Sequence, residues 1–380
     1  MTSTPPVAAT SVDRPPSGEP PSGPAPRAPR LTAVVAIAIP IAAMALVLWV
    51  FGWMRTTEMN RGLVVLVAVL VGVGGVFIFY YGMDRIVDLF AVRWQDRIRP
   101  WVFVGPALVL LSVFLVYPAV NTVILSFRDA SGSEMVGFDN YRFVFTDSAM
   151  LRSIRNTLGW SIIVPLVATV VGLVFAVLAD RLTRLESVAK SLIFLPMAIS
   201  FVGASVVWGF IYDFRAFGNQ TGLLNGLMVA VGQEPVAWLS QEPWNNLLLM
   251  VIMIWMQTGF AMVILSAAIK SVPEDLLEAG RIDGASELQI FRRITVPSIL
   301  SALVVVLTTV VIATLKVFDI VWVLTNGGSG TEVIAERFIR YFFQFRDGGR
   351  GAAVAVLLFL AIVPIMVINV RRFRAEEEIR

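Results

Sequence analysis

Two residue types are absent from the 380-residue chain, which contains no cysteine and no histidine. Without cysteine the chain forms no disulfide and has no thiol nucleophile. Without histidine it lacks the commonest general base, and without either residue it lacks the ligands of the usual zinc sites. These absences exclude thiol-based and histidine-based catalysis and the common zinc centres.

Lysine is rare although arginine is abundant, and it occurs only as Lys190, Lys270 and Lys316. None of the three follows a glycine, so the chain has no Gly-Lys pair of the kind that a phosphate-binding P-loop requires. We therefore expect no cofactor in this chain. If ATP drives its activity, another polypeptide must bind the ATP and Mg.

Charged residues make up only 15% of the chain, whereas hydrophobic residues make up 57%. Such a composition is typical of a protein whose main solvent is lipid. A helix needs about 20 apolar residues to cross about 30 Å of hydrocarbon, and eight stretches are long enough. They lie at 33–53, 62–82, 101–127, 157–180, 188–212, 245–270, 298–324 and 352–370. Because an isolated strand would leave its backbone polar groups unpaired in lipid, we predict an all-α polytopic membrane protein with eight transmembrane helices.

The composition also divides the chain into segments. Residues 1–32 are rich in Pro, Ser, Gly and Ala, and we expect them to form a disordered cytosolic tail. Residues 33–100 would hold two extra transmembrane helices and a cytosolic linker, and residues 101–370 a six-helix core. Residues 371–380 would form a second cytosolic tail with alternating charge.

The basic residues favour one orientation in the membrane. With the amino terminus inside, eighteen of the 30 lysines and arginines lie in inner segments and eleven in outer segments. The positive-inside rule therefore places both termini in the cytosol. The last outer segment conflicts with this assignment, because it holds Arg337, Arg340, Arg346 and Arg350.

One long polar interval, residues 271–297, carries helix signals at both ends. Ser271 with Glu274, and Ser286 with Gln289, each fit a capping box. In this motif the two side chains satisfy free backbone N–H groups at the start of a helix. The interval therefore predicts two short helices, and the positive-inside topology places both in the cytosol.

The break between these two helices is predicted at Asp283–Gly284, because glycine can take the left-handed conformation that ends a helix. Pro297 is expected to close the second helix and to open the next apolar span. Six apolar side chains would leave the hairpin with more hydrophobic surface than a free loop carries in water. They are Leu276, Leu277, Ile282, Leu288, Phe291 and Ile294. We expect this hairpin to dock against another structure.

The same interval resembles the EAA loop of ABC-importer permeases, in which Glu-Ala-Ala is followed at fixed spacing by Gly and by Ile-x-Leu-Pro. The residues in register are Glu278, Ala279, Gly284, Ile294 and Pro297. Gly280 stands where a second alanine is usual, and Val296 where leucine is usual. The resemblance implies that the loop, with Asp283 and Ala285, docks in a cleft of an ATPase subunit and passes its movement to the membrane helices. The alternative is a cytosolic loop that only joins two spans.

A wider resemblance, to carbohydrate-uptake permeases of the maltose type, runs from about residue 106 to residue 372. Its motifs are Tyr117-Pro118, Gly137-Phe138-Asp139-Asn140-Tyr141, Trp238-Leu239 and Leu324-Thr325-Asn326-Gly327-Gly328. Ser329 departs from the proline that usually follows the two glycines. The sequence KVFDIVWVLTNGG is most similar to permeases for α-glucosides such as trehalose, maltose or sucrose.

This resemblance implies an ABC type I importer permease fold with cytosolic coupling helices, in a subunit that is not itself an enzyme. The implied location is the bacterial inner membrane, and no nucleic acid is involved. The implied partners are a second homologous permease subunit, a dimer of cytosolic ATPase subunits that bind ATP and Mg, an extracytoplasmic sugar-binding protein and the lipid bilayer. The chain would form half of the translocation pathway for an oligosaccharide.

Two charges, Lys316 and Asp319, lie inside the predicted span 298–324. Because they are three residues apart, we expect them on one helix face, where they can neutralise each other. An unpaired charge at mid-membrane costs at least about 2.5 kcal/mol, so a partner or a water-filled cavity is required. Either the two residues line the solute route and bind sugar hydroxyls, or they form a structural ion pair or extend to the outer boundary.

The resemblance also implies sugar-contact positions on three spans. They are Met197 and Phe201 on the fifth, Met253, Met256 and Gln257 on the sixth, and Val310, Thr314 and Val317 on the seventh. A pocket with one amide and one hydroxyl would contact the ring face of a sugar better than its hydroxyl rim. Ordinary helix packing is the alternative explanation for each methionine.

Other classes of function stay open at this point. A secondary transporter without an ATPase would contain inverted repeats and paired broken helices, which the sequence does not reveal. An importer permease for another solute, such as glycerol phosphate, would keep the same architecture. A membrane-embedded enzyme would need clustered carboxylates or histidines, whereas Asp319 is the only acidic residue expected deep in a span.

Overall fold

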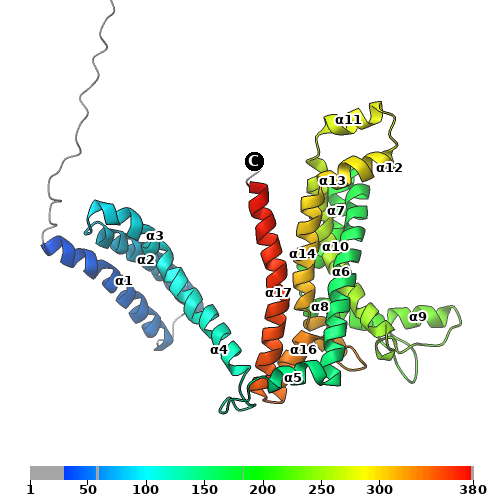
Figure 1. Cartoon of the computed structure of the whole chain (residues 1–380), viewed down its shortest axis with the longest axis horizontal. Coiled ribbons are helices and arrows are strands. Elements are labelled where there is room, and N and C mark those ends of the chain that lie inside the picture. Colours follow the sequence, from blue (N-terminus) through cyan, green and yellow to red (C-terminus); the bar gives the residue numbers. More distant parts are fainter. Residues whose placement is uncertain (1–29, 57–59, 183, 378–380) are drawn as a thin grey trace, which may run out of the picture. The chain divides into compact units, whose positions relative to one another are not determined.

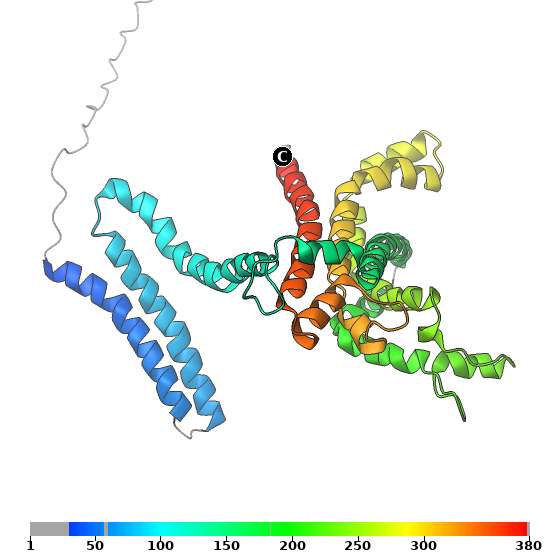
Figure 2. The same ribbon diagram turned by 60° about the horizontal axis from the view of Figure 1, so that its bottom comes forward.

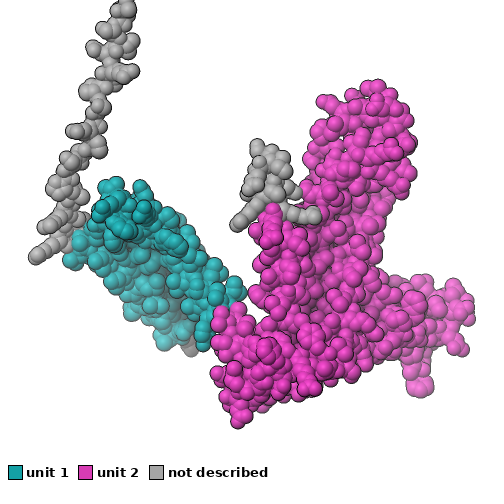
Figure 3. All heavy atoms as spheres, viewed as in Figure 1, with its two compact units in different colours: residues 1–117 teal, residues 118–380 magenta. Residues whose placement is uncertain are grey.

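A computed structural model describes residues 30–56, 60–182 and 184–377 of the chain (Figure 1). The predicted amino-terminal tail lies outside the described residues except for its last three, and so does the end of the predicted carboxy-terminal tail. The described residues divide into two compact units, residues 1–117 and 118–380, which are coloured separately in Figure 3. The boundary falls inside the third predicted span, and each unit is described by itself.

The first unit consists of long helices. Helix α1 spans Arg30–Thr56, α2 spans Arg61–Val87 and α3 spans Val92–Leu111. A π-helical segment at Ser112–Val116 continues α3 into α4, Tyr117–Leu125, of which only Tyr117 belongs to the first unit. The third helix therefore begins well before the predicted start of its span, because the polar segment that precedes residue 101 is itself helical.

Close packing of α1 on α2 depends on two glycines. A Cβ atom added to Gly75 would lie 2.4 Å from Val47, and one added to Gly82 would lie 2.5 Å from Pro40. Small residues let helix backbones approach closely in lipid, where no hydrophobic force drives two helices together. The two helices therefore form a tight antiparallel pair, as Figure 2 shows for the two blue ribbons.

The second unit contains the remaining helices. They are α5 (Asp139–Thr146), α6 (Ser148–Asp180), α7 (Glu186–Phe194), α8 (Phe201–Tyr212), α9 (Leu223–Ala230), α10 (Trp244–Lys270), α11 (Glu274–Ile282), α12 (Glu287–Ile290), α13 (Val296–Ser298), α14 (Leu300–Leu315), α15 (Asp319–Leu324), α16 (Ile334–Ile339) and α17 (Gly348–Glu377). Within the described ranges the only extended pairing is an isolated bridge between Arg128 and Met135. The predicted all-α class is thus confirmed.

The core of the second unit lies where α6, α10 and α14 pack together (Figure 1). Trp160 of α6 and Leu249 and Ile252 of α10 are fully buried there. Gly172 of α6 allows the closest approach, because a Cβ at this position would lie 2.5 Å from the Cβ of Ala261. Apolar side chains and small residues thus hold these helices side by side.

Six helices of the described part are long and apolar enough to cross a membrane, and eight segments qualify if each of two bent helix pairs is one span. The predicted number of eight therefore depends on the bent pairs. Their presence also corrects the expectation that the sequence contains no broken helices.

The predicted span 188–212 is bent rather than straight, because the helix breaks between α7 and α8 and the two parts are turned by 101°. Pro196 stands in the short turn between them, and Ser200 starts α8 by accepting a hydrogen bond from the backbone N–H of Gly203. Gly259 of α10 makes room for this turn, since a Cβ there would lie 2.5 Å from the carbonyl oxygen of Ile193. The break is therefore built into the local sequence.

The predicted span 298–324 does not form one continuous helix either. Helix α14 ends at Leu315 and α15 begins at Asp319, with Phe318 outside the helical conformation at φ −140° and ψ −56°. Lys316 consequently lies in the turn after α14 and Asp319 at the start of α15, and they form no ion pair with each other among the described residues. Apolar content could not reveal this break, because the intervening Val317 and Phe318 are apolar too.

Candidate functional site

Helices α11 and α12 form the predicted hairpin between α10 and α14 (Figure 1). Helix α11 ends where predicted, since Gly284 has φ +77°. The backbone N–H of Ala285 donates to the carbonyl oxygen of Gly280 at 3.0 Å, which closes the turn typical of a glycine-terminated helix. The predicted break at Asp283–Gly284 is therefore confirmed.

Only one of the two predicted capping boxes is present. The Ser286 hydroxyl and the Gln289 amide each accept a hydrogen bond from the other's backbone N–H, as predicted. The box at Ser271 is wrong, because Ser271 ends α10 and its hydroxyl donates to the carbonyl oxygen of Ala268 at 2.7 Å. Pro273 precedes α11 instead, and it makes no side-chain cap. At the end of a helix the free groups are carbonyls, so a serine there donates rather than accepts.

Gly280, the departure from the expected alanine, is buried where the two helices of the hairpin meet. A Cβ atom there would lie 2.8 Å from Cδ1 of Ile294 and 3.4 Å from Cγ1 of Ile290. An ion pair of 3.1 Å between Arg281 and Glu287 also joins α11 to α12. The glycine thus permits closer packing of the hairpin than alanine would.

The outer surface of the hairpin is unusually apolar for a polar loop. Ile282 is 85% exposed, Leu288 59% and Leu276 49%. Glu278 is also exposed and forms no hydrogen bond or ion pair with any described residue. We call these four residues the coupling face. Three exposed apolar side chains and an unpaired charge on one short hairpin are typical of a surface that a partner covers.

A hollow of about 430 Å³ lies beside the coupling face. Its walls hold five of the residues predicted for coupling, together with Gln289, Ile290 and Arg293. They are Gly280, Asp283, Gly284, Ala285, Gln289, Ile290, Arg293 and Ile294. Pro297 lies apart from the hollow in α13, next to the bend of 68° that leads into α14, and Ala279 is exposed on α11.

Two of the three lysines meet in an ionic network at the same end of the helices. Lys190 of α7 donates to Asp180 of α6 at 2.5 Å, to Glu186 at 2.7 Å and to the Ser266 hydroxyl of α10. Lys270, at the end of α10, donates to Glu186. An ammonium group has three donors, and Lys190 uses all of them to join three helices. Only the rarity of lysine in the sequence could have drawn attention to this network.

Replacing Lys190 with methionine is expected to lower stability by about 3 kcal/mol, because Asp180 and Glu186 would lose the cation between them and keep only the more exposed Lys270 as a counter-charge. Lys270→Met is the matched control, since that side chain is 52% exposed and its removal should cost less than about 1 kcal/mol. Thermal unfolding of the detergent-purified chain measures both. Equal losses in the two variants would contradict the buried role of Lys190.

A cavity of about 150 Å³ lies at the break between α14 and α15. It brings together four residues predicted for the pathway, and Val317. They are Phe201 from α8, Met253 from α10, Lys316 and Val317 from the break, and Asp319 from α15. Lys316 is exposed and Asp319 is half-buried. This site combines an apolar wall with two opposite charges, which suits a polar neutral ligand.

The other predicted contact positions do not line this cavity. Thr314 is fully buried, and its hydroxyl donates to the backbone carbonyls of Val310 and Val311 at 3.1 and 2.8 Å. Met256 and Gln257 are buried in α10, whereas Met197 is 42% exposed. The polar groups of the cavity are therefore the two charged side chains rather than a threonine hydroxyl and an amide.

Buried ion pairs account for arginines of residues 325–351, the segment predicted as the last outer one. Arg337 pairs with Glu332 at 3.0 Å, and Arg340 pairs with Glu336 at 2.5 Å. Burial raises the pKa of the fully enclosed Glu336 carboxyl, although the hydrogen bond from Arg340 opposes that rise. Arg350 is paired as well, with Asp347 at 3.5 Å. These arginines have structural partners within the segment.

The turn that precedes this segment differs from the expected one. Ser329 has φ +50°, a value that proline cannot adopt because its ring fixes φ near −65°. The departure from proline therefore matches the backbone of this chain.

Among the described residues no group of three acidic side chains is placed to hold a metal ion.

The arrangement of the helices is similar to that of a solved transporter. The chain matches the crystal structure of a bacterial ABC transporter involved in the import of the acidic polysaccharide alginate, with a TM-score of 0.65. The match has 22% identity and covers 75% of this chain and 99% of that chain. The match shows that the fold is that of an ABC-importer permease.

The sequence comparisons identify the family. Residues 168–373, more than half of the chain, match the family described as "Binding-protein-dependent transport system inner membrane component", and the chain belongs to this family. It is 53% identical over 279 residues to the osmoprotective compounds uptake permease protein GgtC of Synechocystis sp., covering 73% of this chain and 100% of that protein. It is 49% identical over 289 residues to the alpha-glucoside transport system permease protein AglF of Rhizobium meliloti, covering 75% and 85%.

Family membership shows which activity belongs to this chain and which belongs to a separate subunit. The chain is the membrane permease subunit of an ABC importer and is not an enzyme, and the ATPase is a separate subunit. This result removes the secondary transporter and the membrane-embedded enzyme from the functions left open by the residues alone.

Proposed function

We propose that the chain imports an α-glucoside such as trehalose, maltose or sucrose, as one of two homologous permease subunits in an ATP-driven complex. The observation that carries this proposal is the 49% identity to an alpha-glucoside transport permease over 75% of the chain. A second candidate is an osmoprotective compound, because a permease for such compounds is 53% identical over its whole length.

Coupling to ATP in this proposal depends on the hairpin. The coupling face docks in a cleft of one subunit of a cytosolic ATPase dimer, which removes Ile282 and Leu288 from water. When the ATPase closes on ATP and Mg, α11 moves and pulls on the end of α10 at Lys270. The network around Lys190 connects that end to α6 and α7, and α7 leads through its break to Phe201 at the cavity.

The solute route passes the cavity at the break between α14 and α15. Lys316 and Asp319 bind sugar hydroxyls, and Phe201 and Met253 contact the ring face. Cavities that hold small ligands usually measure about 300–1,000 Å³. Because this one measures only about 150 Å³, the homologous partner subunit supplies the rest of the site.

The membrane orientation is proposed from the charges. Both termini and the hairpin lie in the cytosol of a bacterium, and an extracytoplasmic sugar-binding protein delivers its ligand to the opposite end of the second unit. The paired arginines of the last outer segment are consistent with this orientation, since Arg337 and Arg340 are neutralised by carboxylates beside them.

Reconstitution of the complete importer tests the function. Co-purification with a tagged copy of the chain should yield an ATPase and a second permease subunit. In proteoliposomes, trehalose, maltose or sucrose with the cognate binding protein should stimulate ATP hydrolysis and accumulate inside. Stimulation by osmoprotective compounds alone would favour the second candidate, and uptake without ATP would contradict the proposal.

Charge removal in the cavity tests the proposed solute route. Lys316→Met or Asp319→Asn should lower the uptake rate at least tenfold, because a hydrogen bond to a charged group contributes about 1.5–3 kcal/mol. Thr314→Val is the matched control, since its hydroxyl bonds only to its own helix, and it should change uptake less than twofold. Normal uptake in both cavity variants would contradict the assignment.

A further inference from the structure

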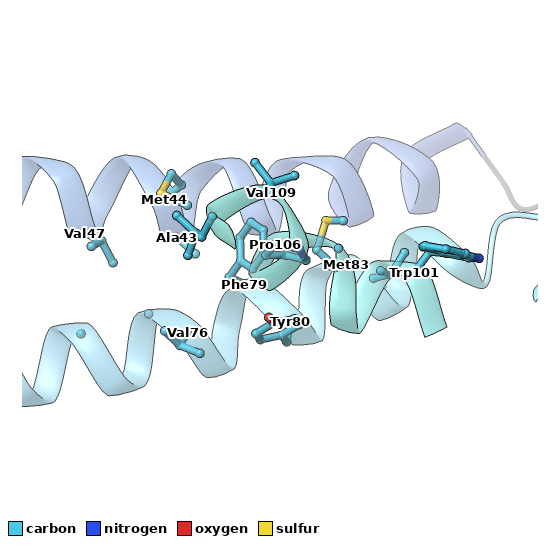
Figure 4. Close-up of a pocket in the computed structure, with 15 residues that line it drawn as sticks. Ala43, Met44, Val47, Val76, Phe79, Tyr80, Met83, Trp101, Pro106 and Val109 are labelled. Atoms are coloured by element: carbon cyan, nitrogen blue, oxygen red, sulfur yellow. The ribbon is translucent and has the colours of Figure 1, made fainter. Parts of the chain in front are cut away.

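A separate cavity of about 750 Å³ opens between α1, α2 and α3 in the first unit. Figure 4 shows Met44 of α1, Phe79 and Met83 of α2, and Pro106 and Val109 of α3 around it. The volume falls within the range of ligand sites, about 300–1,000 Å³. The coupling face and the solute route use none of its residues.

The cavity is a shaped feature of these helices rather than a packing gap. Where α1 and α2 touch, Gly75 and Gly82 leave no room for a Cβ atom. By contrast, Gly72 and Gly105 also line the cavity, and a Cβ at either position would meet nothing within 4 Å. The helices therefore pack tightly at Gly75 and Gly82, whereas the space next to Gly72 and Gly105 stays empty.

A ladder of side chains leads along α3 from a basic end into the cavity. Arg93, Arg97, Trp101 and Gly105 follow one another at intervals of four residues, which brings successive members close together on a helix. Trp101 and Gly105 line the cavity itself. The order of arginine, tryptophan and apolar wall matches the headgroup, interface and hydrocarbon zones of a membrane.

The two arginines of this ladder carry charge that the protein does not neutralise. Arg99 is paired with Asp84 at 3.0 Å and with Asp88 at 3.1 Å. Arg93 and Arg97 form no ion pair within the described part of the chain, and the guanidinium of Arg97 lies 5.8 Å from the centre of the Trp94 ring. A negative group beside them would find two cations available.

We propose that the first unit binds an anionic phospholipid. An acyl chain of the lipid lies in the cavity between α1, α2 and α3, and its phosphate lies at Arg93 and Arg97. Trp101 lies between the two zones and contacts the glycerol region. The basic and the apolar parts fit one amphipathic molecule, and basic sites beside transmembrane helices are where anionic lipids bind. This inference does not depend on the solute that the importer carries.

Lipid retention by the full-length chain tests the proposal. The protein is purified in mild detergent and offered phosphatidylglycerol or phosphatidylcholine, and native mass spectrometry measures the bound lipid. The native chain should retain phosphatidylglycerol at least tenfold better than phosphatidylcholine. The double variant R93Q/R97Q should lose this preference, whereas R55Q/R61Q, which removes two arginines near the other end of the α1–α2 pair, should keep it.

Filling the cavity tests the acyl-chain part independently. Gly105→Leu should lower retention of both lipids at least fivefold, while Gly52→Leu, an equal change in open space outside the cavity, should leave retention unchanged. Circular dichroism and size-exclusion chromatography verify that the variants are folded. Equal retention of the two lipids by the native chain, unchanged retention in Gly105→Leu, or crosslinking of a protein segment into the cavity would overturn the proposal.

Discussion

Ile282→Asp is expected to release the ATPase from the permease while the chain remains folded and inserted in the membrane. The side chain is 85% exposed, so its own fold loses little when it becomes polar. An apolar residue at the centre of an interface often contributes about 2 kcal/mol or more to binding, which corresponds to a loss of about thirtyfold in affinity. Co-purification of the ATPase with the tagged permease measures this loss.

Phe217→Asp provides the matched control for this experiment. Phe217 is 92% exposed and belongs to the segment between α8 and α9, at the end of the second unit away from the hairpin (Figures 1 and 2). The control should retain a full complement of ATPase. Full retention by Ile282→Asp as well would show that the hairpin is not the docking surface.

Glu278→Lys is expected to abolish uptake, with at least a hundredfold loss of rate. The Glu278 carboxylate has no partner among the described residues, so its charge is available to a basic group of the ATPase. Reversing one member of a charge pair that becomes buried on docking costs about 3–5 kcal/mol. Uptake by membrane vesicles measures the loss, and immunoblotting of the membrane fraction measures insertion.

Glu234→Lys makes the same change of charge at an exposed position in the loop after α9. It should import solute at the rate of the unmodified chain. Unchanged uptake in Glu278→Lys, or equal losses in the two variants, would contradict a specific role of Glu278 in coupling.

Much of the fold was predictable because lipid imposes strong rules on a sequence. Long apolar runs located the helices α1, α2, α6, α10 and α17, although α6 starts nine residues before its predicted span, and α2 and α17 end five and seven residues after theirs. Hydropathy records only which residues are apolar, so it places both breaks inside apolar spans. The break after α7 had local signals in Pro196 and Ser200, whereas the break at Phe318 depends on how the chain packs around it.

The candidate site was predictable to a similar degree. Spacing located the hairpin and its glycine turn, since Gly284 and the Ser286 cap act through neighbouring backbone groups. The Lys190 network was not predictable, because Asp180 and Ser266 are 86 residues apart in the sequence. The hydrogen bonds of the Thr314 hydroxyl to the carbonyl oxygens of Val310 and Val311 were also not predicted from the sequence.

The side of the membrane that the hairpin faces is the most direct test of the account. Because the chain has no cysteine, Ile282→Cys introduces a single thiol that a membrane-impermeant maleimide can label without background. We predict labelling in inside-out vesicles only, with protection when the ATPase is bound. Labelling of intact cells from outside would contradict the coupling mechanism and the orientation on which it rests.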